Sequence, residues 1–115
     1  MFVYDPRPTF THTVKVRVPV DGGFEDQDFK ATFQVMPSDE VANYDLNKGE
    51  GSADILGATD FLKKIVVGMS DLIGKDEKPL PYNDQLRDAL LRQLYVRNAL
   101  VRTYFNAVSG AQAGN

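Results

Sequence analysis

Residues 12–35, HTVKVRVPVDGGFEDQDFKATFQV, form the stretch that decides the fold. Valines alternate with polar residues in its first part, which is typical of a half-buried strand. These valines are Val14, Val16, Val18 and Val20. A second alternation follows, and its apolar face carries Phe29, Ala31, Phe33 and Val35. Asp21, Gly22 and Gly23 lie between the two runs and tolerate the positive φ of a turn. The stretch therefore predicts an antiparallel hairpin with one apolar face and one wet face.

The residues on either side of this hairpin predict an arm and a short helix. Residues 1–9 contain Pro6 and Pro8, which hold their neighbours out of a helix, so we expect an extended arm there. After the hairpin, Ser38 is the expected N-cap of a helix with acidic residues in its first turn. We expect this helix to fade by Leu46.

A loop and a longer helix are expected next. Residues 47–52 are rich in Gly, Asn and Ser, which predicts a loop. A helix should then begin near Ser52 or Ala53 and end near Val67, with Gly68 terminating it. Its inward stripe is expected to consist of Ile55, Phe61, Leu62, Ile65 and Val66.

The last third of the chain predicts a second small hairpin and a long helical region. Residues 69–73 and 79–82 could pair across the charged turn GKDEK and extend the sheet edge. Asn83 is the expected cap of the following helix. The apolar stripe shifts near residues 94–95, which indicates a break, and residues 109–115 are expected to form a flexible tail.

Together these elements predict an α+β fold in a single domain spanning residues 1–115. We expect an antiparallel β-hairpin, or three to four short strands, packed against three or four α-helices. The predicted core consists of Val14, Val16, Val18, Phe29, Phe33, Val35, Ile55, Leu62, Ile65, Leu86 and Leu90.

Bulk composition excludes several classes of protein. The chain has 115 residues and no cysteine, so it has no disulfide framework and no thiolate metal site. Its net charge of -3 argues against wrapping nucleic acid through a general positive field. It contains no apolar run long enough to span a membrane, and it begins without a secretory signal pattern. These features are typical of a cytoplasmic protein that engages neither nucleic acid nor membrane.

Residue chemistry gives no support for an enzyme, a metal site or a cofactor site. His12 is the single histidine, and it has no partner of a kind that builds a metal or catalytic site. The acidic clusters lack the spacing of a calcium loop and fit solvated turns. They comprise Asp21, Glu25, Asp26 and Asp28, then Asp76 and Glu77. Residues 49–51 precede a helix but put Glu50 where a phosphate would lie.

Four arginines recur every five residues in the C-terminal helical region: Arg87, Arg92, Arg97 and Arg102. Five residues advance a helix by about 140° beyond a full turn, so these side chains wind around the axis instead of forming a basic stripe. We expect them to flank an apolar helix, or to form rim contacts with an acidic partner.

The C-terminal helical region carries more apolar residues than one core-facing stripe needs. Two explanations are open: a patch that a partner protein covers, or a helix buried on all sides. If a partner covers it, the expected binding residues are Leu91, Tyr95, Leu100, Val101, Tyr104, Phe105 and Val108. Under that explanation Leu100→Asp and Tyr104→Asp would keep the fold and lose the partner.

The order of segments in residues 68–104 resembles the C-terminal half of the phage tail assembly chaperones. The matching residues are Gly68 and Met69, the acidic turn at Asp76 and Glu77, the segment PLPY at residues 79–82, and the helices at 83–91 and 96–104. Two positions depart from that pattern: Met69 stands where a Trp is usual, and the turn lacks its customary Gly.

This resemblance implies a protein that binds the tape measure protein in the host cytoplasm of a phage or prophage, keeps it soluble and promotes assembly of the tail tube. It also implies contact with the tail tube protein, self-association into a ring or spiral, and absence from the mature virion. The alternative is a structural tail-completion or head–tail adaptor protein of the virion. An enzyme that uses the acidic loops on a small ligand is a third hypothesis.

Overall fold

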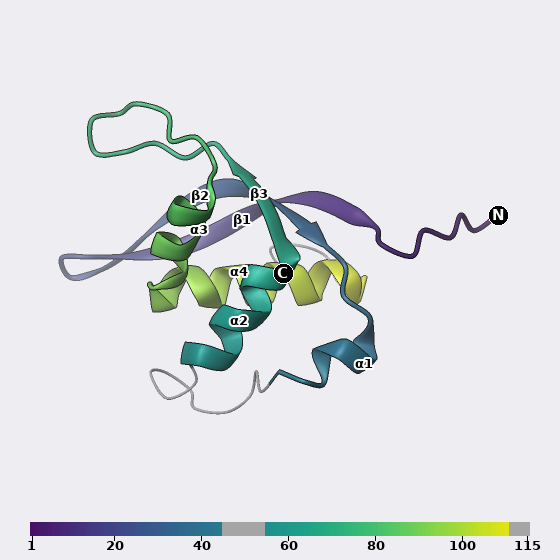
Figure 1. The fold of residues 1–115 in the computed structure, drawn as a ribbon. Coiled ribbons are helices and arrows are strands. Elements are labelled where there is room, and N and C mark those ends of the chain that lie inside the picture. Colours follow the sequence, from purple (N-terminus) through teal and green to yellow (C-terminus); the bar gives the residue numbers. More distant parts are fainter. Residues whose placement is uncertain (45–54, 111–115) are drawn as a thin grey trace.

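A three-stranded antiparallel sheet organises the molecule, in the order β1-β2-β3. The computed structural model describes residues 1–44 and 55–110, with side chains from Ala58 onward in the second range. The strands are β1 (Thr9–Val20), β2 (Gly23–Gln34) and β3 (Val66–Ser70). The helices are α1 (Ser38–Val41), α2 (Ile55–Ile65), α3 (Asp84–Leu91) and α4 (Leu94–Val108). The three longer helices lie on one side of the sheet (Figure 1). The predicted α+β fold is confirmed.

The hairpin of β1 and β2 is longer than the alternating sequence runs. A two-residue turn at Asp21 and Gly22 joins the strands, and Gly22 has a φ of 80°, a value that glycine adopts without a Cβ penalty. Pairing extends from Val20 opposite Gly23 to Thr9 opposite Gln34. The predicted hairpin is therefore confirmed, and the ladder begins at Thr9 although the sequence alternation is clear only from His12.

Two helix boundaries differ from the prediction. Ser38 is the first residue of α1 and makes no capping bond, because Pro37 occupies the N-cap position. The helix ends at Val41, well before Leu46. The predicted loop at 47–52 lies outside the described residues.

The predicted end of the second helix is also wrong. α2 ends at Ile65, and Val66 to Ser70 form β3, so Gly68 lies within a strand. β3 pairs antiparallel with β2, with Lys30 opposite Ser70 and Thr32 opposite Gly68. β-branched Val66 and Val67 favour a strand, and the available edge of β2 decides the competition.

The segment between β3 and α3 forms a turn with little strand pairing. The predicted second hairpin is reduced to one bridge, between Ile73 and Pro79. The turn is closed by bonds from the Gly74 N–H to the Lys78 carbonyl (2.9 Å) and from the Leu80 N–H to the Leu72 carbonyl (2.8 Å). β3 extends the sheet edge, but only Met69 and Ser70 of the predicted strand at 69–73 belong to it.

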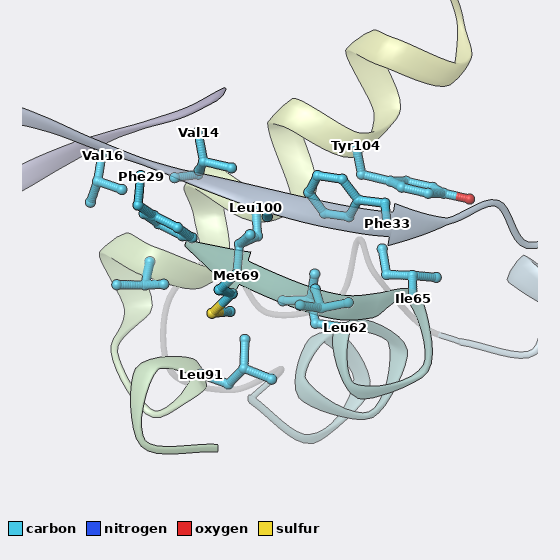
Figure 2. Packing of buried hydrophobic residues seen from close by; sticks show 14 of the residues in the cluster. Val14, Val16, Phe29, Phe33, Leu62, Ile65, Met69, Leu91, Leu100 and Tyr104 are labelled. Atoms are coloured by element: carbon cyan, nitrogen blue, oxygen red, sulfur yellow. The ribbon is translucent and has the colours of Figure 1, made fainter. Parts of the chain in front are cut away.

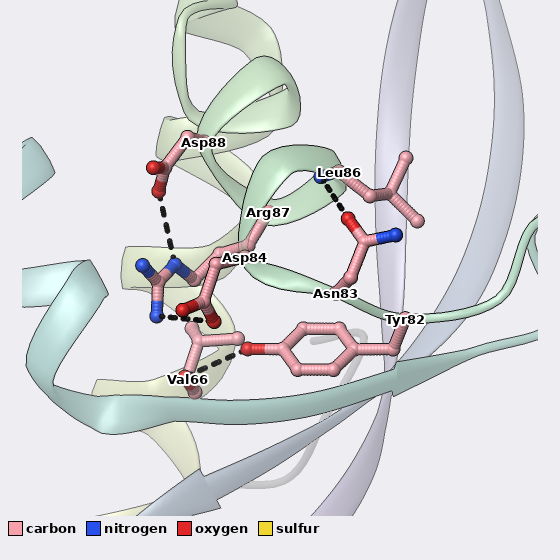
Figure 3. Close-up of polar contacts among 7 residues, drawn as sticks. All are labelled: Val66, Tyr82, Asn83, Asp84, Leu86, Arg87 and Asp88. Atoms are coloured by element: carbon pink, nitrogen blue, oxygen red, sulfur yellow. Dashed lines mark hydrogen bonds and ion pairs between the residues drawn. The ribbon is translucent and has the colours of Figure 1, made fainter.

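The start of α3 follows its sequence signal. Asn83 Oδ1 accepts a hydrogen bond of 2.8 Å from the Leu86 N–H, which confirms the predicted N-cap (Figure 3). Beside this cap, the Tyr82 hydroxyl donates to the Val66 carbonyl over 3.4 Å and connects the entry of α3 to β3. The predicted break falls at residues 92–93, between α3 and α4.

The core lies between the sheet and the three longer helices (Figure 2). Six predicted core residues are buried: Val14, Val16, Phe29, Phe33, Leu62 and Ile65. Val18, Val35, Leu86 and Leu90 are only partly buried, and the side chain of Ile55 lies outside the described residues. Phe61, which the sequence placed on the inward stripe of its helix, is also buried, and buried residues that the prediction omitted include Met69, Leu91, Leu100 and Tyr104.

Candidate partner-binding site

Helix α4 presents one face to the core. Val96, Ala99, Leu100 and Tyr104 are buried on that face. The Tyr104 ring packs against Phe33, with ring centroids 5.7 Å apart, and against Phe61 at 5.5 Å. Its hydroxyl accepts a 2.9 Å hydrogen bond from the Met36 N–H. This face therefore joins α4 to the sheet and to α2.

The expectation of an exposed patch is wrong for three of its seven residues. Leu91 and Leu100 are 0% exposed and Tyr104 is 1% exposed. These residues are covered because β1, α2 and α3 all pack against α4, which is more cover than one hairpin face provides. Phe61 from α2 and Phe33 from β2 supply the aromatic surface that encloses Tyr104.

The side of α4 next to this face carries a second row of mainly apolar residues, which we call the outer stripe. It consists of the apolar residues Leu94, Val101, Phe105 and Val108, with the polar Asn98 between the first two. The spacing alternates between four and three residues, as on a helix that packs along another helix. Leu94 is 41% exposed and Val108 is 43% exposed, while Val101 and Phe105 are partly buried. Three of the predicted binding residues, Val101, Phe105 and Val108, lie on this stripe.

The outer stripe contacts α2 through one of its aromatic residues. The Phe105 ring stacks on the Phe61 ring, with centroids 5.6 Å apart and planes 6° apart. Tyr95, another predicted binding residue, is partly buried, packs against the core and lies beside the stripe. A helical face with part-exposed apolar side chains is the kind of surface on which an apolar helix of a partner can pack.

The four arginines lie in different environments, and not all of them are the solvated flanks that the sequence predicted. Arg102 is exposed and donates from Nη2 to the Lys15 carbonyl over 2.9 Å, which connects α4 to β1. Arg97 is buried and donates from Nη1 to the Leu91 carbonyl over 2.8 Å, at the end of α3. Arg92 is exposed. Arg102 and Arg97 therefore have structural contacts that the sequence did not indicate.

Arg87 forms a cluster of opposite charges with two aspartates on α3 (Figure 3). Its Nε donates to Asp88 Oδ1 over 3.0 Å, and its Nη1 lies 3.6 Å from Asp84 Oδ1. Desolvation lowers the pKa of this guanidinium, but the hydrogen bond and the charge of Asp88, with smaller contributions from Tyr82 and Asp84, raise the pKa above its ordinary value. The side chain therefore stays charged beside Asp88 and ties the first two turns of the helix.

The other candidate residues occupy ordinary structural positions. Because a carbonyl only accepts, His12 Nδ1 donates to the Thr13 carbonyl over 2.8 Å. The acidic residues of both turns are exposed, and residues 49–51 lie outside the described part of the chain. Within residues 1–44 and 55–110, no three His, Asp or Glu side chains are grouped as metal ligands. None of the helices described there has the length and apolarity to cross a membrane.

Comparison with protein-family models, with curated proteins and with solved structures gives no match for this chain.

Proposed function

We propose that the chain is a tail assembly chaperone of a long-tailed phage or prophage. In this proposal it acts in the host cytoplasm, binds the tape measure protein, keeps it soluble, promotes assembly of the tail tube and is absent from the mature virion. Support comes from residues 68–104, whose segment order resembles that family. These residues comprise the end of β3, the acidic turn, α3 and most of α4.

The observation that carries the proposal is the outer stripe of α4. A chaperone for a long helical client needs an apolar helical face that stays accessible, and the stripe has that spacing and partial exposure. Full burial of a Leu or Val side chain contributes about 1.5–3 kcal/mol, so completing the burial of Leu94 and Val108 would contribute roughly half of that each. One copy would therefore bind weakly.

Weak individual contacts suit a client that offers many similar sites. Several copies placed along one extended helix would hold it tightly, because each bound copy raises the effective concentration of the next. Self-association of the chaperone strengthens this effect further. The same weakness allows the copies to leave when tail tube subunits take their place.

The test is co-expression of this chain with the very long, helix-rich product encoded near it. We expect that product to be soluble when this chain is present and to aggregate when it is absent. Mass spectrometry of purified particles should then find no copies of this chain. Copies present at structural stoichiometry in the particle would contradict the proposal and favour a virion component.

Two variants test whether the outer stripe is the binding surface. Leu94→Asp and Val108→Asp should leave the fold intact, because both side chains are more than two-fifths exposed, yet greatly reduce the soluble fraction of the client. Val67→Asp is the matched control, since Val67 is 47% exposed on β3, away from the stripe. Equal loss of client solubility in all three variants, or no loss in any, would show that the stripe is not the site.

A further inference from the structure

Strand β2 has an open edge over about half of its length. β3 pairs with residues 30–33 of β2 only. Asp71, directly after β3, has a φ of 61°, so the chain leaves the extended conformation there. Among residues 1–44 and 55–110, residues 23–29 of β2 therefore have only β1 as a strand neighbour.

The register identifies the backbone groups on this edge. The Val35 N–H donates to the Pro8 carbonyl, and hydrogen-bonded pairs alternate in an antiparallel ladder. Odd-numbered residues of β2 therefore bond to β1, and even-numbered residues direct their N–H and C=O groups to the other side. The outward backbone groups of Lys30 and Thr32 pair with β3. Phe24, Asp26 and Asp28 present theirs at the open edge.

The other strand edge of the hairpin is less available. On β1 the outward carbonyls include those of Thr13 and Lys15, which accept from His12 Nδ1 and Arg102 Nη2. Pro19 has no N–H to donate on this side. The distal part of β2 is therefore the better template for an added strand.

The N-terminal arm has the properties of such a strand. Residues 1–4 are Met, Phe, Val and Tyr, and each side chain is at least 75% exposed. Phe, Val and Tyr are strong strand formers. In Figure 1 the arm runs away from the body of the molecule, at the end opposite the hairpin turn. Its apolar side chains thus have no cover within one described copy.

We infer that residues 1–5 of one copy pair as an added β-strand with residues 24–28 of β2 in a second copy. The two segments match in length at five residues each. Pro6 and Pro8 lack the N–H that a longer ladder would need, so they mark the end of the added strand. Apolar side chains of the arm would then lie beside Phe24, which is 56% exposed.

The added strand comes from a second copy, because the arm cannot reach the open edge of β2 in the same copy. β1 runs from Thr9 toward the turn, so the arm points the other way. Eight residues span at most about 26–29 Å, and a reversal would use part of that length. To lie along residues 24–28 the arm would have to reverse, cross the end of the sheet and pass β3, whose pairing covers residues 30–33.

This inference deepens the proposed function, since it rests on self-association and supplies the contact that would produce it. It needs no client, so it is tested on the purified chain alone. If the chain shows no pairing between arm and edge but still solubilises the client, the inference is overturned and the proposed function stands. If the arm pairs with the edge but the client stays insoluble, the inference stands and the proposed function is overturned.

Disulfide trapping gives the direct test, because the chain contains no cysteine. Residue 3 is central in the arm segment and residue 26 in the edge segment, so they face each other in parallel or antiparallel pairing. A Val3→Cys chain mixed with an Asp26→Cys chain should form a mixed disulfide, identified by mass spectrometry of the linked peptides. A Thr11→Cys chain, altered on β1, is the control partner. Cross-linking to Thr11→Cys at an equal or greater yield would overturn the inference.

Proline variants give the second test. Val3→Pro removes an N–H from the arm, and Asp26→Pro removes one that points away from β1, so the hairpin ladder itself is kept. Each should weaken self-association by about tenfold or more in sedimentation experiments. Val3→Thr, which keeps a strand-forming residue, should associate as the unaltered chain does. Circular dichroism establishes that each variant is folded. An unaltered chain that stays monomeric, or proline variants that associate normally, would overturn the inference.

Discussion

At the scale of single residues, Glu77 is held in an unfavourable backbone conformation. Its φ is 65°, and its N–H donates to the Gly74 carbonyl in the turn before α3. A left-handed conformation costs a non-glycine residue about 1–2 kcal/mol, and glycine avoids this cost. Part of the gain is offset, because glycine loses more conformational entropy on folding than other residues do. We therefore expect Glu77→Gly to raise the free energy of unfolding by about 0.5–1 kcal/mol, measured by urea denaturation.

Lys75→Gly is the matched control for that substitution. Lys75 lies in the same turn and has no positive φ, so glycine there brings only its entropic cost. Its free energy of unfolding should fall slightly. Stabilisation by both substitutions, or by neither, would show that the φ of Glu77 is not a source of strain.

Arg97 shows what single-residue patterns cannot predict. The five-residue spacing of the arginines indicated solvated side chains, yet Arg97 is 4% exposed. Its partner is the carbonyl of Leu91, a group left free because α3 ends there. The hydrogen bond depends on the break at residues 92–93 and on the angle between two helices. Neither of these is encoded in the identity of Arg97.

At the scale of elements, the two faces of α4 make opposite predictions. Leu100→Ala should lower the free energy of unfolding by about 2–5 kcal/mol, because Leu100 is fully buried and its removal leaves a cavity. Val108→Ala should change it by less than about 0.5 kcal/mol, because that side chain is largely exposed. Chemical denaturation of both variants measures the difference. Similar changes in the free energy of unfolding for the two variants would mean that α4 packs a different face against the core.

This burial also replaces the earlier expectation for Leu100→Asp and Tyr104→Asp. A carboxylate at either position would be enclosed by apolar side chains, so these variants should unfold instead of losing a partner selectively. The exposed ends of the outer stripe, Leu94 and Val108, are the positions where charge can be added without that cost.

Elements with local signals could be predicted from the sequence, and elements fixed by distant contacts could not. The hairpin has alternation and a Gly turn, and α3 has the Asn83 cap, so both were predicted. The start of β3, Val66 and Val67, was predicted as the end of a helix, because its strand state depends on an edge of β2 more than thirty residues away. The burial of Tyr104 likewise depends on Phe33 and Phe61, and periodicity within α4 gave no sign of them.

At the scale of the whole molecule, the core lies under one part of the hairpin and the other part projects beyond it. The principal extents are 46 × 31 × 30 Å. Phe33 and Ala31 of β2 are buried, whereas Phe24 near the turn is 56% exposed. Figure 1 shows the turn of the hairpin extending past the helices, with the arm leaving at the opposite end. The stability of the sheet should therefore decrease along β2 toward the turn.

Residue-resolved hydrogen exchange tests this gradient and its dependence on association. In dilute solution the N–H groups of Ala31 and Phe33 should exchange slowly, because both bond to β1 over the core, and that of Glu25 should exchange faster. The outward N–H groups of Asp26 and Asp28 should exchange fastest. At high concentration these two should gain protection as the arm of another copy pairs with them, and a Val3→Pro chain should show no such gain. Strong protection of Asp26 and Asp28 in dilute solution would mean that a segment of the same copy already covers the edge. An equal gain in the Val3→Pro chain would assign the contact to something other than the arm.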